Sequence, residues 1–363
     1  MTRRQRLAAL VGCVALAWGV SGCWDQHPVE TRAAVAAIGI DPGPQPGLQR
    51  YTFTFPNVTT TTSSLSSISP NQQFYTIPVV ASGLIPALAA AQRQESRTLY
   101  LGQVRIVCLS THLPAAVWRQ TLTTMADSGQ FVLTTWVVAA PVAQAIVSVT
   151  PPVEVVPEVG LYNALVCHCQ AIRWPGRGWR VWAAVATPGV SPPVVQVTSQ
   201  QDRFHLRAIA VLGRRHAHPW PVLATQGWAY LTGDVTKGEL TVPIHHTRNV
   251  VGLIRGTRRL HFRTAGDHVT AIVQLDYSGV LVGEPGGGDS VHEDRLVEAA
   301  VAQRIQHAVA AAWAEAQATQ TDPMGWHRDA GWAGMPHADS TDWAHWALDT
   351  TVHFTLREEG VLR

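Results

Sequence analysis

The sequence lacks the motifs of several enzyme classes. It contains no Gly-x-Ser-x-Gly nucleophile turn and no HExxH helix, so neither an esterase-like hydrolase nor a zinc protease of that type is indicated. The glycine-rich stretch at residues 283–288 has no P-loop lysine and is interpreted as a flexible connector. The sequence therefore predicts a non-enzymatic protein with no catalytic residue, no cofactor and no metal ligand.

Lysine is almost absent, and the small basic excess comes from the first 22 positions. Lys237 is the only lysine among 27 basic residues, which face 25 acidic ones. Arg3, Arg4 and Arg6 precede Cys23 and no acidic residue does, so the remainder carries 24 basic against 25 acidic residues. This balance offers no support for a nucleic-acid partner.

Long hydrophobic runs are missing as well, apart from one short run near the start. Residues 7–20 are apolar, whereas a helix needs about 20 apolar residues to span a bilayer. A basic start, a short apolar run and small residues are typical of an export signal. The run ends in Val20-Ser21-Gly22-Cys23, the lipobox pattern of bacterial lipoproteins, which predicts cleavage after Gly22 and diacylation of Cys23. An ordinary secretory signal with an incidental Cys23 is the alternative.

Cysteine is scarce, and the five cysteines need separate interpretations. Cys13 would leave with the signal and Cys23 would carry lipid, so three remain, and an odd number cannot pair completely within one chain. Cys108 lies in an apolar run and is predicted to be a buried strand residue. Cys167 and Cys169 flank a histidine, but paired zinc ligands usually have two or more residues between them. Buried sulfurs at a strand or helix end are expected instead.

The length predicts more than one domain. About 340 residues follow the signal, which is more than one hydrophobic core usually organises. We expect a signal peptide over residues 1–22, an N-terminal α/β region over residues 23–195 that has the length of one or two domains, and a C-terminal domain over residues 196–363. The boundary falls within a proline-rich polar stretch at residues 189–201 that is typical of a linker.

In the N-terminal region short apolar strands alternate with helices, which predicts a mixed α/β unit. Ser82 and either Ser110 or Thr111 are suitable N-caps. Residues 57–73 are rich in Ser and Thr and are expected to form an exposed flexible loop. Strands are predicted at residues 51–55, 75–80, 100–109 and 131–139, helices at residues 84–97, 114–125 and 141–147, and residues 161–171 are ambiguous.

The second half is predicted to be a mainly antiparallel sheet with a long C-terminal helix. Ser290 and Glu293 form a capping box for a helix that reaches residue 318, about 42 Å at the standard rise. Its single apolar stripe indicates that it lies across a sheet or a second domain. The stripe consists of Val297, Val301, Ile305, Val309 and Trp313. Strands are predicted at residues 206–212, 228–231, 239–243, 258–263, 270–277, 280–282 and 350–357. The predicted fold class is multidomain α+β.

Histidine and tryptophan clusters are the remaining candidate sites. The pairs His216 with His218 and His245 with His246 have no carboxylate in matching register, so exposed loop histidines are expected rather than metal ligands. Four C-terminal tryptophans offer an aromatic platform for a ligand, but packing beneath the long helix is favoured because indole is large and mostly buried. These are Trp326, Trp332, Trp343 and Trp346.

Short motifs spread along the chain form a recognisable set. They are Cys23-Trp24-Asp25 with Glu30, Gly39-Ile40-Asp41, Leu101-Gly102-Gln103-Val104, Asp322-Pro323-Met324-Gly325, a strand-like stretch at residues 227–233, and the ending at residues 352–360 after Trp343 and Trp346. The set resembles the Ger(x)C family, the lipoprotein C subunits of nutrient germinant receptors in endospore-forming bacteria. Residues 213–220 depart from the family pattern, with Arg and His where a Lys-containing turn is usual.

The resemblance implies a multidomain α+β fold and a non-enzymatic subunit that acts in receptor assembly or signalling during spore germination. It implies a place on the outer face of the inner spore membrane, with the membrane contacted through an N-terminal diacylglycerol. It also implies integral-membrane A and B subunits as partners. No motif identifies the family's ligand-contacting residues in this sequence, so the resemblance implies no ligand-binding residue.

Two other classes stay open. A free-standing solute-binding lipoprotein would have two similar α/β lobes around a cleft, which the strand-rich second half and the long helix disfavour. A surface metallohydrolase would use His216, His218 or Cys167 as zinc ligands.

Overall fold

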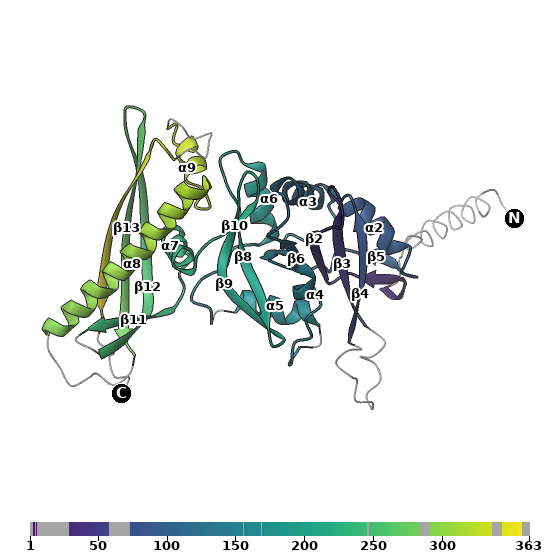
Figure 1. Ribbon diagram of the computed structural model, residues 1–363, viewed down its shortest axis with the longest axis horizontal. Helices are drawn as coiled ribbons and strands as arrows, with labels where there is room; N and C mark the ends of the chain where they lie inside the picture. The colour runs from purple at the N-terminus through teal and green to yellow at the C-terminus, as the bar shows by residue number, and fades with distance from the viewer. Residues whose placement is uncertain are drawn as a thin grey trace.

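The computed structural model describes residues 3, 5, 29–57, 73–154, 156–167, 169–244, 247–282, 291–335 and 343–357. The molecule is elongated, with an N-terminal region built on one large sheet beside a C-terminal region built on a second sheet and a long helix (Figure 1). The predicted fold class is therefore confirmed. Outside the described residues lie the lipobox, most of the Ser/Thr-rich loop, His245 and His246, the glycine-rich connector and Ser290 of the capping box.

The N-terminal region is organised around an eight-stranded mixed sheet with the order β10-β9-β8-β7-β6-β2-β3-β4. The central strands β2, β6, β7 and β8 are parallel neighbours, and the strands on both sides pair in antiparallel fashion. The strands are β2 (Ala37–Pro42), β3 (Gln49–Pro56), β4 (Phe74–Ala81), β6 (Ile106–Ser110), β7 (Trp136–Ala140), β8 (Pro193–Gln200), β9 (Arg203–Leu212) and β10 (Ala217–Pro219).

Helices cover both faces of the central strands, which explains their continuous apolar sequence. All residues of β6 and β7 are buried. Ile106 and Cys108 belong to the core shared with α4 and α5, whereas Val107 and Leu109 belong to the core shared with α2, α3 and α6. The helices are α2 (Leu84–Gln92), α3 (Ala115–Ser128), α4 (Ala143–Val147), α5 (Pro157–Val166) and α6 (Gly178–Ala186).

Cys108 is fully buried and has a free thiol, as predicted. Burial, together with the nearby charge of Asp41, raises the pKa of this thiol well above its usual value. A buried, protonated thiol is chemically inert, so Cys108 serves packing.

A small parallel sheet extends past the amino ends of the central strands. Helix η1 (Val29–Thr31) leads into β1 (Arg32–Ala34), which pairs with β5 (Thr98–Tyr100). The single strand predicted over residues 100–109 is thus divided in two. The chain turns between β5 and β6, where Val104 N donates to Leu101 O at 3.0 Å.

The C-terminal sheet has the order β11-β12-β13-β14. Its pairs are antiparallel except for β13 with β14, which is parallel. The elements are α7 (Val222–Thr232), β11 (Gly238–Ile244), β12 (Thr247–Ala265), β13 (His268–Leu281), α8 (Val291–Thr319), α9 (Trp326–Trp332) and β14 (Trp346–Leu356).

Helix α8 lies across this sheet, as its apolar stripe predicts (Figure 1). Val297, Val301, Ile305 and Val309 are buried, and Trp313 is half-buried. The same core cluster continues through α7 to α4 and α5, so the two regions share one apolar core.

Two sequence predictions about the chain between the regions are wrong. Residues 228–231 are predicted as a strand but lie in α7, because a short apolar run does not distinguish a strand from a buried helix. Residues 189–201 are predicted as a linker but mostly form β8, whose Val194, Val195 and Val197 are buried. The stretch resembles a linker in composition because prolines lie at the start of β8 and polar residues lie at its exposed end. A division of the chain near residue 195 stays a prediction.

The predicted helix caps also need correction. The residue before α2 is Gly83 rather than Ser82, and the residue before α3 is Pro114; neither makes a side-chain cap hydrogen bond. Ser110 instead donates from its hydroxyl to Pro141 O at 2.8 Å and joins the ends of β6 and β7.

Glycine is required where α7 crosses α8. A Cβ atom at Gly227 would overlap the carbonyl oxygen of Ala308, which is part of the α8 backbone. A backbone atom in a packed helix cannot move aside as a flexible side chain can, so a larger residue would push α7 away from α8.

We expect Gly227→Ala to lower the free energy of unfolding by about 1–3 kcal/mol, although alanine favours helix more than glycine does. Urea unfolding measures this loss. The matched control is Gly238→Ala, because a Cβ there meets Ala171 at an ordinary 3.5 Å. Equal stability of the two variants would contradict the close approach.

Candidate functional site

The predicted lipidation site lies outside the described residues. Val20, Ser21, Gly22 and Cys23 precede Val29, where the continuous described chain begins. Lipidation of Cys23 and cleavage after Gly22 therefore stay predictions. What the structure describes is the surface next to the point where this segment enters the fold.

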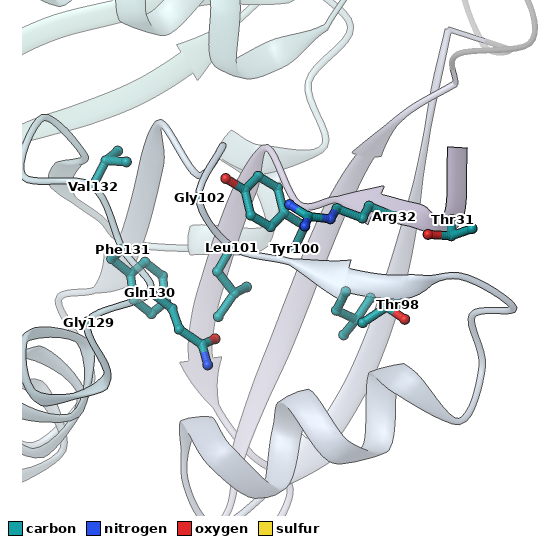
Figure 2. Close-up of a pocket in the computed structure, with 11 residues that line it drawn as sticks. Thr31, Arg32, Thr98, Tyr100, Leu101, Gly102, Gly129, Gln130, Phe131 and Val132 are labelled. Atoms are coloured by element: carbon teal, nitrogen blue, oxygen red, sulfur yellow. The ribbon is translucent and has the colours of Figure 1, made fainter. Parts of the chain in front are cut away.

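A groove of about 510 Å³ lies at this point, beside the β1–β5 sheet (Figure 2). Arg32 of β1 places its guanidinium 4.8 Å from the ring centre of Tyr100 in β5. The ring of Tyr100 also folds over Gly102, where a Cβ atom would overlap it. The opposite wall comes from the segment after α3, which includes Gln130, Phe131 and Val132.

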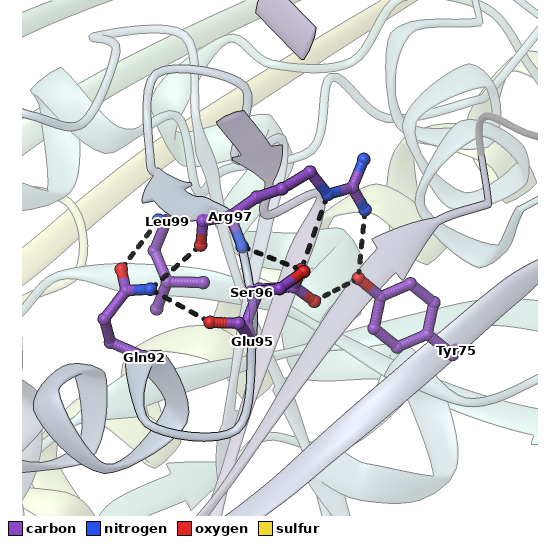
Figure 3. A network of polar contacts seen from close by, with 6 residues as sticks. All are labelled: Tyr75, Gln92, Glu95, Ser96, Arg97 and Leu99. Atoms are coloured by element: carbon purple, nitrogen blue, oxygen red, sulfur yellow. Dashed lines mark hydrogen bonds and ion pairs between the residues drawn. The ribbon is translucent and has the colours of Figure 1, made fainter. Parts of the chain in front are cut away.

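A polar network fixes the loop that leads into β5 (Figure 3). The Tyr75 hydroxyl donates to Glu95 Oε2 at 2.5 Å, and Arg97 donates from Nε to Glu95 Oε1 at 3.4 Å. Gln92 at the end of α2 donates to Arg97 O at 2.9 Å and accepts from Leu99 N at 2.9 Å. These bonds join α2, β4 and β5, so the groove wall is held from three elements.

The same contacts shift the pKa values of Glu95 and Tyr75. Burial alone would raise the pKa of Glu95, but hydrogen bonds from Tyr75 and Arg97 lower it below its usual value. Burial and then the hydrogen bond to Glu95 raise the pKa of Tyr75. Glu95 is therefore a paired carboxylate and Tyr75 a neutral donor at neutral pH.

Two further grooves continue along the amino ends of the parallel strands. The first, of about 320 Å³, shares Gly102 and Val132 with the groove above and contains Arg105 and Tyr162. The second, of about 180 Å³, contains Trp136. It adjoins the first because Trp136 N donates to Arg105 O at 2.7 Å. We call the surface formed by these three grooves and their exposed rim the amino-edge face.

Arginine guanidinium groups stack on aromatic rings along the amino-edge face. Arg105 lies 5.4 Å from the ring centre of Tyr162, and Arg177 lies 5.3 Å from that of Trp136. Arg180 lies 5.1 Å from the ring centre of its neighbour Trp179. Such stacking orients the cation without neutralising its charge.

One buried acid lies behind this face. Glu158, in the first turn of α5, is only 4% exposed. Burial raises its pKa to about 7, and the attraction of Arg105 only partly offsets this effect.

The motif Gly39-Ile40-Asp41 has a structural role. Asp41 accepts hydrogen bonds from Ala143 N at 2.7 Å and Gln144 N at 2.8 Å, so its carboxylate caps the start of α4. A Cβ at Gly39 would approach Val147 of α4 to 2.9 Å, so glycine allows the helix to pack against β2.

The motif at residues 322–325 lies between α8 and α9 and caps the start of α9 in a similar way. Asp322 accepts hydrogen bonds from Gly325 N at 2.9 Å and from His327 N at 2.8 Å, and it lies 3.1 Å from His327 Nδ1. Asp322 and His327 are both fully buried. Asp322 O also accepts from Ser191 N at 3.0 Å, which ties this turn to the N-terminal region.

Three of the four C-terminal tryptophans pack in the core as expected. Trp326, Trp343 and Trp346 are buried around His327, and Trp343 Nε1 donates to Thr321 O at 3.0 Å. The expectation is wrong for Trp332, which is 79% exposed at the end of α9. Arg328 stacks on its ring at 4.8 Å.

The remaining candidate ligands are separated. Cys167 and Cys169 form a disulfide just after α5; Cys167 is half-buried and Cys169 exposed, so the prediction of buried sulfurs is wrong. His216 is exposed as expected, but His218 is half-buried in β10, and burial followed by the charge of His216 lowers its pKa. Among the described residues no three His, Cys, Asp or Glu side chains gather closely enough to hold a metal ion.

No helix within the described ranges combines the length and apolarity needed to cross a membrane.

We expect Asp322→Ala to lower the free energy of unfolding by about 2–6 kcal/mol, because two buried backbone N–H groups lose their acceptor. Urea unfolding provides the measurement. Asp349 is exposed in β14, so Asp349→Ala is the control and should change stability by less than about 0.5 kcal/mol. A loss below about 1 kcal/mol for Asp322→Ala would contradict its role as a buried cap.

Glu158 should make stability depend on pH. Its pKa is about 7 in the folded chain and near 4.5 when exposed, so the folded state binds more protons between these values. The free energy of unfolding should fall by up to about 3 kcal/mol as pH rises through this window. Urea unfolding at pH 5 and at pH 8 measures this difference in the free energy of unfolding. Glu158→Gln should abolish the difference, whereas Glu239→Gln, at an exposed position, should leave it unchanged. An unchanged profile in Glu158→Gln would refute the assignment.

Comparison with known families gives two matches in tandem. Residues 25–194 match the model described as the spore germination protein N-terminal domain. Residues 210–360 match the model described as spore germination B3/GerAC-like, C-terminal. No match to the chain is found among curated proteins.

A solved structure shares the fold. The crystal structure described as that of the GerBC protein aligns with a TM-score of 0.57 and 10% sequence identity. The alignment covers 88% of this chain and 97% of that chain. Because the two family models together span most of the sequence, the chain belongs to the GerAC-like family of spore germination proteins.

Proposed function

We propose that the chain is a lipid-anchored, non-enzymatic subunit of a nutrient germinant receptor, and that it acts in receptor assembly or signalling. Membership of the family makes it a GerC-like component of a germination receptor. The observation that carries the proposal is the tandem family match, which starts at residue 25, two positions after Cys23. This start agrees with Cys23 as the first residue of the mature protein.

The proposed anchor is a diacylglycerol on Cys23. Two acyl chains hold a protein stably on a bilayer, whereas one chain holds it only reversibly. We place the anchored chain on the outer face of the inner spore membrane, beside integral-membrane A and B subunits. Its role there is to bind and position these partners rather than to transform a substrate.

Two features of the fold support a receptor subunit over the alternatives. A solute-binding lipoprotein is expected to have two similar lobes, whereas the two sheets here differ in strand number and order. A metallohydrolase would need His216, His218 or Cys167 near further ligands, and Cys167 is bonded to Cys169.

We expect Cys23→Ala to abolish lipidation and stable membrane retention, and to impair nutrient-triggered germination, with the fold intact. Fractionation of spore membranes and the rate of germination after nutrient addition are the measurements. The matched control is Cys13→Ala, the same substitution within the predicted signal, which should leave both unchanged. Normal retention and germination in Cys23→Ala would count strongly against the anchor.

Purification from the same membranes adds a second readout. The unaltered chain should co-purify with two polytopic membrane proteins. Recovery of the chain from membranes without such partners would argue against the receptor assignment while leaving the anchor standing.

A further inference from the structure

We propose that the amino-edge face docks onto the anionic phospholipid headgroups of the membrane that holds the chain. This inference rests on the proposed lipid anchor at Cys23, and it assigns a binding role to a surface that the anchor alone does not require. Three independent observations support it: charge, exposed apolar groups and the length of the tether.

The charge of the face suits a surface of phosphates. The described residues that line its three grooves include five arginines and no aspartate or glutamate. Guanidinium groups bind phosphate oxygens with paired hydrogen bonds. The nearest acids are paired or hidden, since Glu95 is bonded to Tyr75 and Arg97, Asp234 lies 3.8 Å from Arg173, and Glu158 is buried.

Exposed apolar groups gather on the same rim. Tyr100, Val132, Leu133 and Trp179 are 36%, 39%, 64% and 48% exposed. Leu133 and Trp179 are adjacent, because Trp179 N donates to Leu133 O at 3.3 Å. Tyrosine and tryptophan favour the headgroup level of a bilayer, where the ring meets apolar tails and the polar atom meets water.

The tether limits which face can meet the membrane. Eight residue steps separate Cys23 from Thr31, which lines the first groove, so at most about 28 Å of extended chain joins lipid to groove. Because the fold is elongated (Figure 1), a tether this short cannot bring the far end of the molecule to the lipid. The amino-edge face is thus the built surface that the anchor holds closest to the headgroups.

Lipid explains this combination better than an acidic protein segment. A protein partner would favour one complementary shape, whereas here the cations are spread over three shallow grooves from Arg32 to Arg180. Four of the five arginines stack on aromatic rings, which form an apolar base beneath the cations and suit a mobile layer of phosphates above hydrocarbon.

The test uses the full lipidated chain reconstituted into vesicles of phosphatidylcholine with or without phosphatidylglycerol. Leu133→Cys is labelled with a polarity-sensitive fluorophore under non-reducing conditions. Cys108 is buried and Cys167 is bonded to Cys169, so these thiols do not compete for the label. We expect a blue-shifted, brighter signal only on vesicles that contain phosphatidylglycerol, and a weaker one at high salt.

Arginine variants test the charge. Arg105→Gln combined with Arg180→Gln should lower the ratio of docked to undocked chain about 25-fold, since each arginine near an anionic surface contributes about fivefold. The matched control combines Arg203→Gln with Arg207→Gln, two exposed arginines on β9 outside the three grooves. A label at His205→Cys on β9 should show no shift.

Vesicle flotation separates this inference from the anchor. If the chain floats but the label at residue 133 does not respond, the docking face is refuted and the anchor stands. A shift that is equal without phosphatidylglycerol, or that needs the receptor's membrane subunits, also overturns the proposal. Failure to float refutes the anchor, and the docking proposal falls with it.

Discussion

Parallel pairing of β2, β6 and β7 is the constraint on which the N-terminal surface depends. Parallel strands point their amino ends toward one edge of a sheet, and each connection must return the chain to that edge. Arg105 immediately before β6 and Thr134 shortly before β7 therefore meet there, beside Arg32 of β1. The arginine and aromatic residues of the amino-edge face are neighbours because of strand direction, although they are far apart in the chain.

A second constraint is the junction between the two regions. The buried Asp322 turn ends α8, begins α9 and bonds to Ser191, while Gly227 lets α7 approach the α8 backbone. One apolar core passes through this junction from α4 and α5 to the C-terminal sheet. The junction thus joins the large N-terminal sheet to the long helix α8 through one continuous core.

The motifs that resemble the family act mainly in packing. Asp41 caps α4, Asp322 caps the turn after α8, and Gly39 and Gly102 accommodate close neighbours. Most strands, the buried Cys108 and the α8 stripe could be predicted because alternation and helical spacing are local signals. Helix α7, helix α6 and the divided strand at residues 98–110 were not predictable, since short apolar runs fit either structure until their neighbours are known.

The sequence by itself determined the fold class, the course of α8, the family and the expected anchor at Cys23. These follow from local spacing and from short motifs, each of which spans only a few residues. Tertiary structure alone decided that β8 joins β7 to β9 in the large sheet, that Trp332 is exposed, and that four arginines stack on aromatic rings along the amino-edge face. The physical reason is that strand order, burial and long-range contacts depend on which surfaces meet, and no local pattern encodes that choice.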